Sequence, residues 1–217
     1  MNAAVLGTGQ VGIALAKGLA ATGHTVVFGT RDPQGDNARK AVAAVPGSTA
    51  LPYADAARGA DFALLATPWA GTAQALELTG AAAVAGKLVI DATNPLEMGP
   101  TGPRLAIGHT TSAGETVQAA LPQARVVKAF NIINCGLFWQ PKFADGQPDM
   151  LIAGNDAAAK QQVAGLLRSF GWRTPIDVGG IDKARLLEPL AMLWIDYGVS
   201  RNHWTHGFSL LGQRSAS

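Results

Sequence analysis

Three glycines near the start of the chain have a spacing that suits phosphate binding. An apolar run over residues 2–6 leads into Gly7, Gly9 and Gly12, in the pattern G-x-G-x-x-G, and an alanine-rich segment follows. Between a strand and a helix, these glycines allow a tight turn, a close backbone approach to a pyrophosphate, and close helix packing. The first N–H groups of the helix would face the phosphates. We therefore predict that residues 7–12, which include Thr8, Gln10 and Val11, bind a dinucleotide.

The end of the next apolar run indicates which dinucleotide this is. Residues 26–28 lead into Gly29-Thr30-Arg31, where a site for NAD would carry an acid that binds the ribose hydroxyls. A hydroxyl and a guanidinium instead suit a ribose 2′-phosphate, because arginine donates forked, charge-assisted hydrogen bonds. At about 1.5–3 kcal/mol each, two such bonds favour NADP(H) over NAD(H) on the order of a hundredfold. We interpret the adjacent Asp32-Pro33 as a helix-initiating turn, since proline suits a first helical position.

Polar residues follow three further apolar runs. They are Thr67-Pro68-Trp69, Thr93-Asn94-Pro95-Leu96 and Asn131-Ile132-Ile133-Asn134. In a doubly wound sheet, ligands bind outside the carboxyl ends of the strands. Thr67 and Pro68 are expected beside the ribose of the cofactor, with Trp69 packed on it. The side chains of Asn94 and Asn131 can both donate and accept, which matches a carboxamide. Ordinary turn chemistry is the alternative, because Asn, Pro and Thr are common in turns.

The elements that position these residues alternate along the 217-residue chain. Apolar runs predict strands at 2–6, 26–29, 62–66, 88–92, 125–130, 150–153 and 174–177. Helices are predicted around 13–21, 34–44, 70–84, 113–120, 156–170 and 182–197, and a loop over 98–103. The alternation indicates a Rossmann-type doubly wound, mostly parallel α/β sheet with helices on both faces and a small C-terminal extension. We expect one domain over 1–217, with a dinucleotide-binding core (1–135) and additional strands and C-terminal helices (136–217).

Composition excludes several classes of protein. The net charge is +2 and no run of Lys or Arg occurs, which argues against nucleic-acid binding. The single Cys135 excludes a disulfide framework and a cysteine-based metal site. No His, Asp or Glu cluster has metal-ligand spacing, so no metal is expected. No apolar run approaches the ~20 residues of a membrane helix, and no signal peptide is apparent. We expect a cytoplasmic protein without membrane contact.

Five motifs together resemble a known family. They are Gly7-Thr8-Gly9-Gln10-Val11-Gly12, Gly29-Thr30-Arg31, Ala66-Thr67-Pro68-Trp69, Ala92-Thr93-Asn94-Pro95-Leu96 and Val127-Lys128-Ala129-Phe130-Asn131. In this order they resemble the NADPH-dependent coenzyme F-420 (deazaflavin) reductases. They also resemble the soluble reductase domain of the six-transmembrane metalloreductases. The resemblance extends over nearly the whole chain.

The resemblance implies that residues 7–12, Thr30, Arg31 and the 67–69 turn hold NADPH, and that the protein is a homodimer. Asn94-Pro95 and Ala129–Asn131 would border the nicotinamide. The implied reaction is hydride transfer between NADP(H) and a flavin-like ring, with a deazaflavin or flavin as co-substrate and no dedicated catalytic side chain. The acceptor stays open, because the segment 131–140 matches no known deazaflavin contact.

Two alternatives remain. A dehydrogenase of a small carbonyl or imine would need a catalytic residue, for which Lys183 is the only plausible lysine after residue 130. A non-catalytic NADPH-binding sensor would need only the cofactor site. Near the C-terminus, His203 and His206 could reach the active site, although a surface role is favoured. We expect Cys135 to be a buried apolar filler, and Trp194 to belong to the core or to a dimer interface.

Overall fold

The computed structural model describes residues 1–100 and 102–212. Its strands are β1 (Asn2–Leu6), β2 (Thr25–Thr30), β3 (Thr49–Pro52), β4 (Phe62–Leu65), β5 (Leu88–Asp91), β6 (Leu96–Gly99), β7 (Gly102–Leu105), β8 (Arg125–Lys128), β9 (Leu151–Gly154) and β10 (Ile176–Asp177). Its α-helices are α1 (Gln10–Ala21), α2 (Asp36–Ala44), α3 (Tyr53–Gly59), α4 (Trp69–Thr79), α5 (Ala113–Ala120), α6 (Ala157–Ser169) and α7 (Ala184–Arg201). Short 3-10 helices lie at Ala81–Val84, Cys135–Leu137 and Ile181–Lys183.

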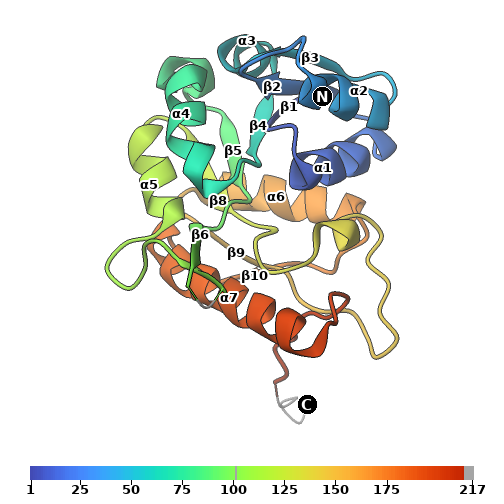
Figure 1. Cartoon of the computed structure of the whole chain (residues 1–217), viewed down its shortest axis with the longest axis vertical. Helices are drawn as coiled ribbons and strands as arrows, with labels where there is room; N and C mark the ends of the chain where they lie inside the picture. Colours follow the sequence, from blue (N-terminus) through green and yellow to red (C-terminus); the bar gives the residue numbers. More distant parts are fainter. Residues whose placement is uncertain (101, 213–217) are drawn as a thin grey trace.

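Eight strands form one sheet in the order β10-β9-β8-β5-β4-β1-β2-β3 (Figure 1). The strand order reverses beside β1, because β2 pairs on one side of it and β4 on the other, both parallel. The strands β4, β5 and β8 continue in parallel register, and β9 then pairs antiparallel to β8. The predicted doubly wound, mostly parallel sheet is confirmed, and the predicted C-terminal strands extend the same sheet.

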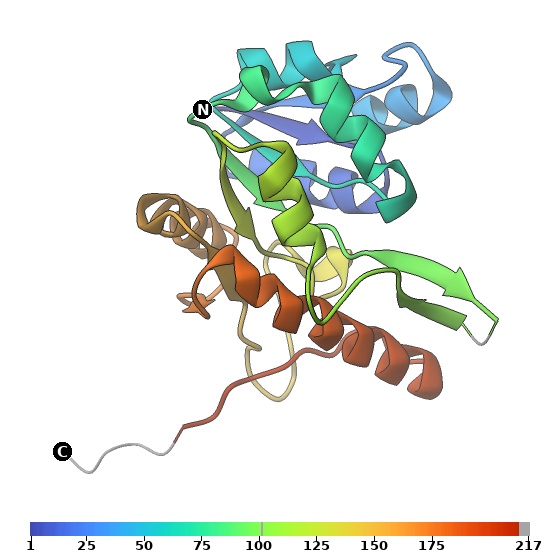
Figure 2. The ribbon, with the colours of Figure 1, turned by 90° about the vertical axis from the view of Figure 1, so that its left-hand side faces the viewer.

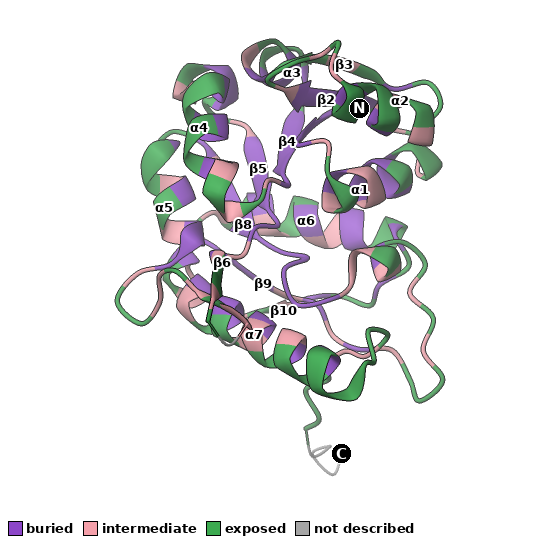
Figure 3. Ribbon diagram, viewed as in Figure 1, coloured by how far each residue is buried: buried purple, intermediate pink, exposed green. Residues whose placement is uncertain are grey.

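Helices cover both faces of the sheet because its strands are apolar on both sides. On one face, Leu15, Leu19, Val163 and Leu167 from α1 and α6 pack on the strands. On the other face, α3, α4 and α5 pack their alanines, Leu76 and Val117 on the same strands. In Figure 3 the central strands β1, β4, β5 and β8 are largely buried, and exposed residues lie mainly on the outer sides of the helices, in the loops and on β3 and β6. This double covering explains why near-continuous apolar runs predicted a parallel sheet.

The sequence-based expectation omitted β3 and α3, and it also differs from the structure in the region of β6 and β7. The predicted loop over 98–103 is part of an antiparallel hairpin, in which β6 pairs with β7. Glu97 and Arg104 form an ion pair across the two strands, with Oε1 and Nη2 2.8 Å apart. The prediction of a loop was wrong because two prolines and two glycines in this region hide the strand pattern. The hairpin projects from the sheet beside α7 (Figure 2).

Helix α7 and the chain after it form the small C-terminal extension. The helix begins two residues later than predicted and continues four residues further, to Arg201. It contacts α5 and β7, and it lies along the lower side of the molecule in Figure 1. Asn202 ends the helix in the left-handed conformation (φ +47°), and the chain then turns back. The extension therefore adds a wall at the carboxyl ends of β5 and β8.

Candidate active site

The turn between β1 and α1 needs its glycines for different reasons. Gly7 has a φ of +127°, and a Cβ there would lie 2.5 Å from the carbonyl oxygen of Ala66. A Cβ on Gly12 would lie 2.3 Å from the carbonyl oxygen of Gly7. Gly9 has an ordinary φ of −79°, and nothing lies within 4 Å of the place its Cβ would take. Gly7 and Gly12 therefore serve close packing, whereas Gly9 leaves open space for a ligand.

The amino end of α1 is free to bind an anion. Gly9 is the N-cap residue, no side chain of the residues that the structure describes caps the helix, and its first turn holds no acidic residue. The first N–H groups of a helix have no partner within the helix, and the helix dipole adds partial positive charge there. A diphosphate placed beside Gly9 would satisfy these donors.

A cavity of about 680 Å³ opens next to this helix end. It is lined by Gly7, Thr8, Gly9, Thr30, Arg31, Asp32, Gly35, Asp36, Asn37, Lys40, Tyr53, Ala66, Thr67 and Pro68. The structure thus brings the predicted Thr30, Arg31, Thr67 and Pro68 to one cavity with the glycine turn. Lys40 was missed by sequence reasoning, because only the placement of α2 brings it to the same cavity as Arg31. The two cations in the lining suit a phosphate group.

Local contacts order the rim of this cavity. Arg31 Nη1 donates to Gln74 Oε1 at 3.0 Å, which joins the end of β2 to α4. Thr67 and Thr72 share a hydrogen bond of 2.9 Å between their hydroxyls. Asp32 Oδ1 accepts from the backbone N–H of Gln34 at 3.0 Å, so Asp32 has the predicted turn role. Pro33, however, is not the first helical residue, because α2 begins at Asp36.

A second cavity, of about 270 Å³, lies at the carboxyl ends of β5 and β8. It is lined by Gln10, Val11, Ala92, Asn94, Phe130, Asn131, Ile133, Asn134, Cys135, Phe138, Trp194 and Trp204. The glycine turn connects the two cavities, because Gly9 lines the first while Gln10 and Val11 line the second. The second cavity is therefore where the reactive end of an extended dinucleotide would reach.

Two amides form a reciprocal pair at this cavity. Asn94 Nδ2 donates to the carbonyl oxygen of Asn131 at 2.8 Å, and Asn131 Nδ2 donates to Asn94 Oδ1 at 3.0 Å. Asn131 Nδ2 also donates to the carbonyl oxygen of Leu187 on α7 at 3.0 Å. Asn131 Oδ1 is buried and has no hydrogen-bond partner in the described part of the chain. A buried acceptor without a partner is costly, so this oxygen suits an N–H donor of a ligand.

The backbone before Asn131 is strained. Phe130 has a φ of +66°, which is rare for a residue with a bulky side chain. Its ring is buried against Phe138, with centroids 5.0 Å apart. Such strain costs about 1–3 kcal/mol and persists where surrounding packing enforces it. Here it turns the chain so that Asn131 faces Asn94.

The aromatic wall of the second cavity comes from the C-terminal extension. Trp194 Nε1 donates to the carbonyl oxygen of His206 at 2.9 Å, and the two rings stack 4.7 Å apart. Trp204 packs on Gly198, where a Cβ would lie 2.7 Å from its ring. Sequence reasoning placed Trp194 in the core or a dimer interface and missed Trp204. No sequence signal shows that the chain after α7 returns to the cavity.

Several predicted site residues lie behind the cavities rather than in their lining. Gly12 packs in the first turn of α1, and Trp69 is the half-buried first residue of α4. Pro95 is buried, and its carbonyl oxygen accepts from Ala106 N at 2.7 Å. Ala129 has no exposed surface and belongs to the core. These four residues support the residues that line the cavities.

Cys135 lines the second cavity and is half-buried. Burial is the largest influence on its thiol and raises its pKa. The thiol therefore stays protonated at neutral pH and is a weak nucleophile. Within residues 1–100 and 102–212, no group of three His, Cys, Asp or Glu side chains could hold a metal ion.

Comparison with known proteins identifies the family. A family model described as NADP oxidoreductase coenzyme F420-dependent matches residues 2–95. The F420-dependent NADP reductase of Methanothermobacter marburgensis is 31% identical over 218 residues, which cover 92% of this chain and 93% of that protein. The chain belongs to the family of F420-dependent NADP reductases. Its members are NADP-dependent oxidoreductases, which supports the use of NADP(H) by this chain.

Two further relatives agree with this family assignment. A candidate F420-dependent NADP-reductase from Arthrobacter sp. FB24, a solved structure, is 37% identical, with a TM-score of 0.92 over 98% of this chain and all of that one. Metalloreductase STEAP3 of Rattus norvegicus is 29% identical over 191 residues. That alignment covers 87% of this chain but only 36% of the metalloreductase. Among the residues described, no helix is long and apolar enough to span a bilayer.

Proposed function

We propose that this protein transfers a hydride between NADP(H) and a flavin-like ring, a deazaflavin or a flavin. The observation that carries the proposal is the second cavity, where aromatic rings and neutral amides meet at the reactive end of the cofactor path. The relative from Methanothermobacter marburgensis is an F420-dependent NADP reductase, which supports a deazaflavin in particular.

The residues of the first cavity fit the adenine half of NADP(H). Gly9 leaves room for the diphosphate beside the free helix end, and Arg31 and Lys40 supply charge for a 2′-phosphate. In the second cavity, Asn131 Oδ1 lacks a donor, as a carboxamide N–H would provide. The chain thus holds both ends of the cofactor with backbone N–H groups, two cations and an amide pair.

The lining of the second cavity favours a planar acceptor ring. Trp204 is the exposed aromatic ring of this lining and offers a surface on which such a ring can stack, while Trp194 and Phe138 are buried beside it. A volume of about 270 Å³ is below the roughly 300–1,000 Å³ of pockets that enclose whole drug-sized ligands. We expect the cavity to take the ring, while the remainder of the acceptor stays outside.

The protein positions the reactants rather than supplying an acid or base. Within the described part of the chain, the residues that line the second cavity include no Asp, Glu, His, Lys or Arg, and its one thiol stays protonated. Bound NADPH supplies the hydride. The amide pair orients the nicotinamide side of the site, and the aromatic wall excludes water and holds the acceptor face.

Anaerobic loss of NADPH absorbance by the purified protein tests this function. The deazaflavin coenzyme, FMN, FAD, a small carbonyl and a small imine are offered in parallel, with NADH as a control. We expect fast, NADPH-dependent turnover with one of the ring acceptors. Turnover restricted to the carbonyl or imine would replace the proposal with a dehydrogenase. Binding of NADPH without turnover of any acceptor would favour a sensor.

A further inference from the structure

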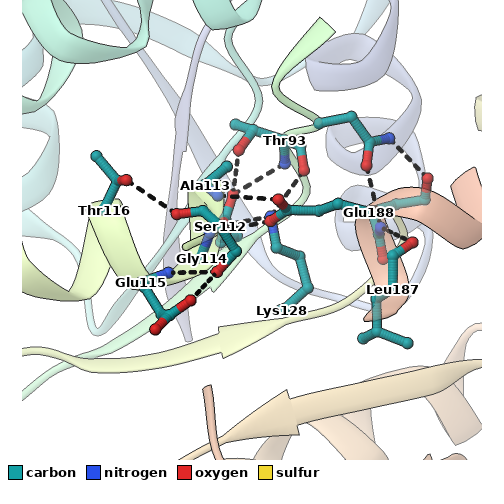
Figure 4. Close-up of polar contacts among 12 residues, drawn as sticks. Thr93, Ser112, Ala113, Gly114, Glu115, Thr116, Lys128, Leu187 and Glu188 are labelled. Atoms are coloured by element: carbon teal, nitrogen blue, oxygen red, sulfur yellow. Dashed lines mark hydrogen bonds and ion pairs between the residues drawn. The ribbon is translucent and has the colours of Figure 1, made fainter. Parts of the chain in front are cut away.

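A fully buried lysine lies directly behind the amide pair. Lys128 has no exposed surface, and its ammonium group contacts Asp91 Oδ2 at 2.7 Å, Glu188 Oε1 at 2.9 Å and the carbonyl oxygen of Thr93 at 2.8 Å (Figure 4). The contact with Thr93 is a hydrogen bond, and the contacts with Asp91 and Glu188 are ion pairs. A lysine is almost never fully buried unless it is paired, so the surroundings of Lys128 are built around its charge.

Helix α5 compensates the second carboxylate. Glu188 accepts from the backbone N–H groups of Ala113 and Gly114 at 2.9 and 3.0 Å, at the amino end of this helix (Figure 4). Asp91 Oδ1 accepts from the N–H and the hydroxyl of Thr93 at 2.9 and 2.7 Å. The positive charges of Lys128 and of the helix end thus balance the negative charges of the two carboxylates. This balance offsets much of the desolvation cost of burying these groups.

The contacts of Lys128 lead to both halves of the active site. Thr93, whose carbonyl Lys128 binds, directly precedes Asn94 of the amide pair. Glu188 directly follows Leu187, whose carbonyl accepts from Asn131. About two helical turns beyond Glu188, α7 carries Trp194 of the aromatic wall. The lysine is therefore the shared contact between the nicotinamide side of the cavity and the acceptor side.

We propose that Lys128, through Glu188 and Thr93, is a positioning residue that fixes helix α7 and its aromatic wall relative to the Asn94–Asn131 pair. Hydride transfer needs the two reacting rings held face to face, and a shift of about 1 Å can cost roughly a hundredfold in rate. This inference takes the identity of the acceptor from the proposed function. The effect of Lys128 on the nicotinamide side of the cavity can be measured without any acceptor.

The test uses two variants of the full-length protein. Glu188→Gln keeps the side-chain shape and leaves Lys128 and Asp91 as a balanced pair, but it replaces one of the two acceptor oxygens by an amide nitrogen. The N–H groups of this nitrogen oppose the backbone N–H of either Ala113 or Gly114. Lys128→Met removes the shared contact entirely. Arg185→Met is the matched control, because Arg185 also joins α7 to α5, through Glu115 at 2.7 Å, without contacting Thr93 or Lys128.

Three measurements separate positioning from a merely structural role. Binding of 2′-phospho-ADP-ribose reports the adenine half alone. Tryptophan-sensitised emission of bound NADPH reports the nicotinamide relative to the five tryptophans of the chain, of which Trp194 and Trp204 line the second cavity. Single-turnover reduction of the acceptor at saturating NADPH reports hydride transfer. We expect Glu188→Gln and Lys128→Met to bind the fragment as wild type does, to change the emission, and to slow transfer roughly ten- to hundredfold. Arg185→Met should match wild type throughout.

The outcomes distinguish this inference from the proposed function. If wild type reduces no ring acceptor, the proposed function fails, and the emission still decides whether Lys128 positions the nicotinamide side. Unchanged emission and rate in Glu188→Gln would overturn the positioning role. The positioning role would also be overturned if both variants lost fragment binding, emission and rate equally, or if both failed to fold. The contacts of Lys128 would then be structural only.

Discussion

Arg31 lines the first cavity from the end of β2, and Lys40 lines it from α2. We expect Arg31→Ala to weaken NADPH binding roughly ten- to hundredfold, because a hydrogen bond to a charged group contributes about 1.5–3 kcal/mol. Binding of NADH should change little, since it lacks the 2′-phosphate. Fluorescence titration with both cofactors measures this. The control Arg58→Ala removes an arginine that pairs with Asp55 outside the cavity, and equal losses for NADPH and NADH would contradict the assignment.

Gly9 and Gly12 should respond differently to the same substitution. Gly9→Ala places a methyl group in open space within the cavity, so folding should be unaffected while NADPH binding weakens. Gly12→Ala forces a methyl group against the backbone of Gly7 and should destabilise the fold by about 1–3 kcal/mol, or several degrees in Tm. Thermal unfolding without cofactor and NADPH titration separate the two. A fall in Tm for Gly9→Ala would contradict the assigned role of the open space.

The sequence predicted site residues whose role is local. The roles of the three glycines and of the Thr30-Arg31 pair depend on residues close in the sequence, so the sequence alone can indicate them. Trp204 and the buried Lys128 are not, because their roles arise only when α7 and the chain after it pack against β5 and β8. Residues such as Ala129 share a motif with the site yet lie in the core.

At the scale of elements, the contact between α5 and α7 should depend on pH. The hydrogen bond from Arg185 is the largest influence on Glu115 and holds its pKa below the usual 4.5. Near pH 4.5 the unfolded chain therefore binds more protons than the folded one. The stabilisation from the Arg185–Glu115 pair is complete above pH 4.5 and is lost as the pH falls through the lower pKa of the folded state. We expect the Tm of wild type to fall more steeply below pH 4.5 than that of Glu115→Gln. Parallel slopes would show that the pair contributes nothing.

The elements themselves were predictable to the extent that burial shaped their sequence. The strands β4, β5 and β8 are covered on both faces, and their apolar runs identified them. The hairpin β6–β7 is only partly buried and is rich in glycine and proline, so its pairing left no such run. Pairing energy from cross-strand contacts such as Glu97 with Arg104 is invisible to an apolar pattern.

At the scale of the whole molecule, the homodimer stays a prediction. Helix α7 exposes Leu186, Leu193 and Tyr197, with exposed fractions of 65%, 57% and 46%. Exposed apolar side chains along one helix are typical of a subunit contact. We expect wild type to sediment as a dimer, and Leu193→Glu to shift the population toward monomer at equal protein concentration. Sedimentation of wild type as a monomer would contradict the prediction.

The glycine turn contributes residues to both cavities, and this has a kinetic consequence. Gln10 and Val11 belong to the glycine turn, yet they line the cavity with the aromatic wall. A nicotinamide held there would become part of the surface on which the acceptor stacks. Addition should therefore be ordered, with the dinucleotide first to arrive and last to leave. A non-reactive acceptor analogue would then tighten NADPH binding instead of displacing it, and NADPH would tighten the analogue by the same factor.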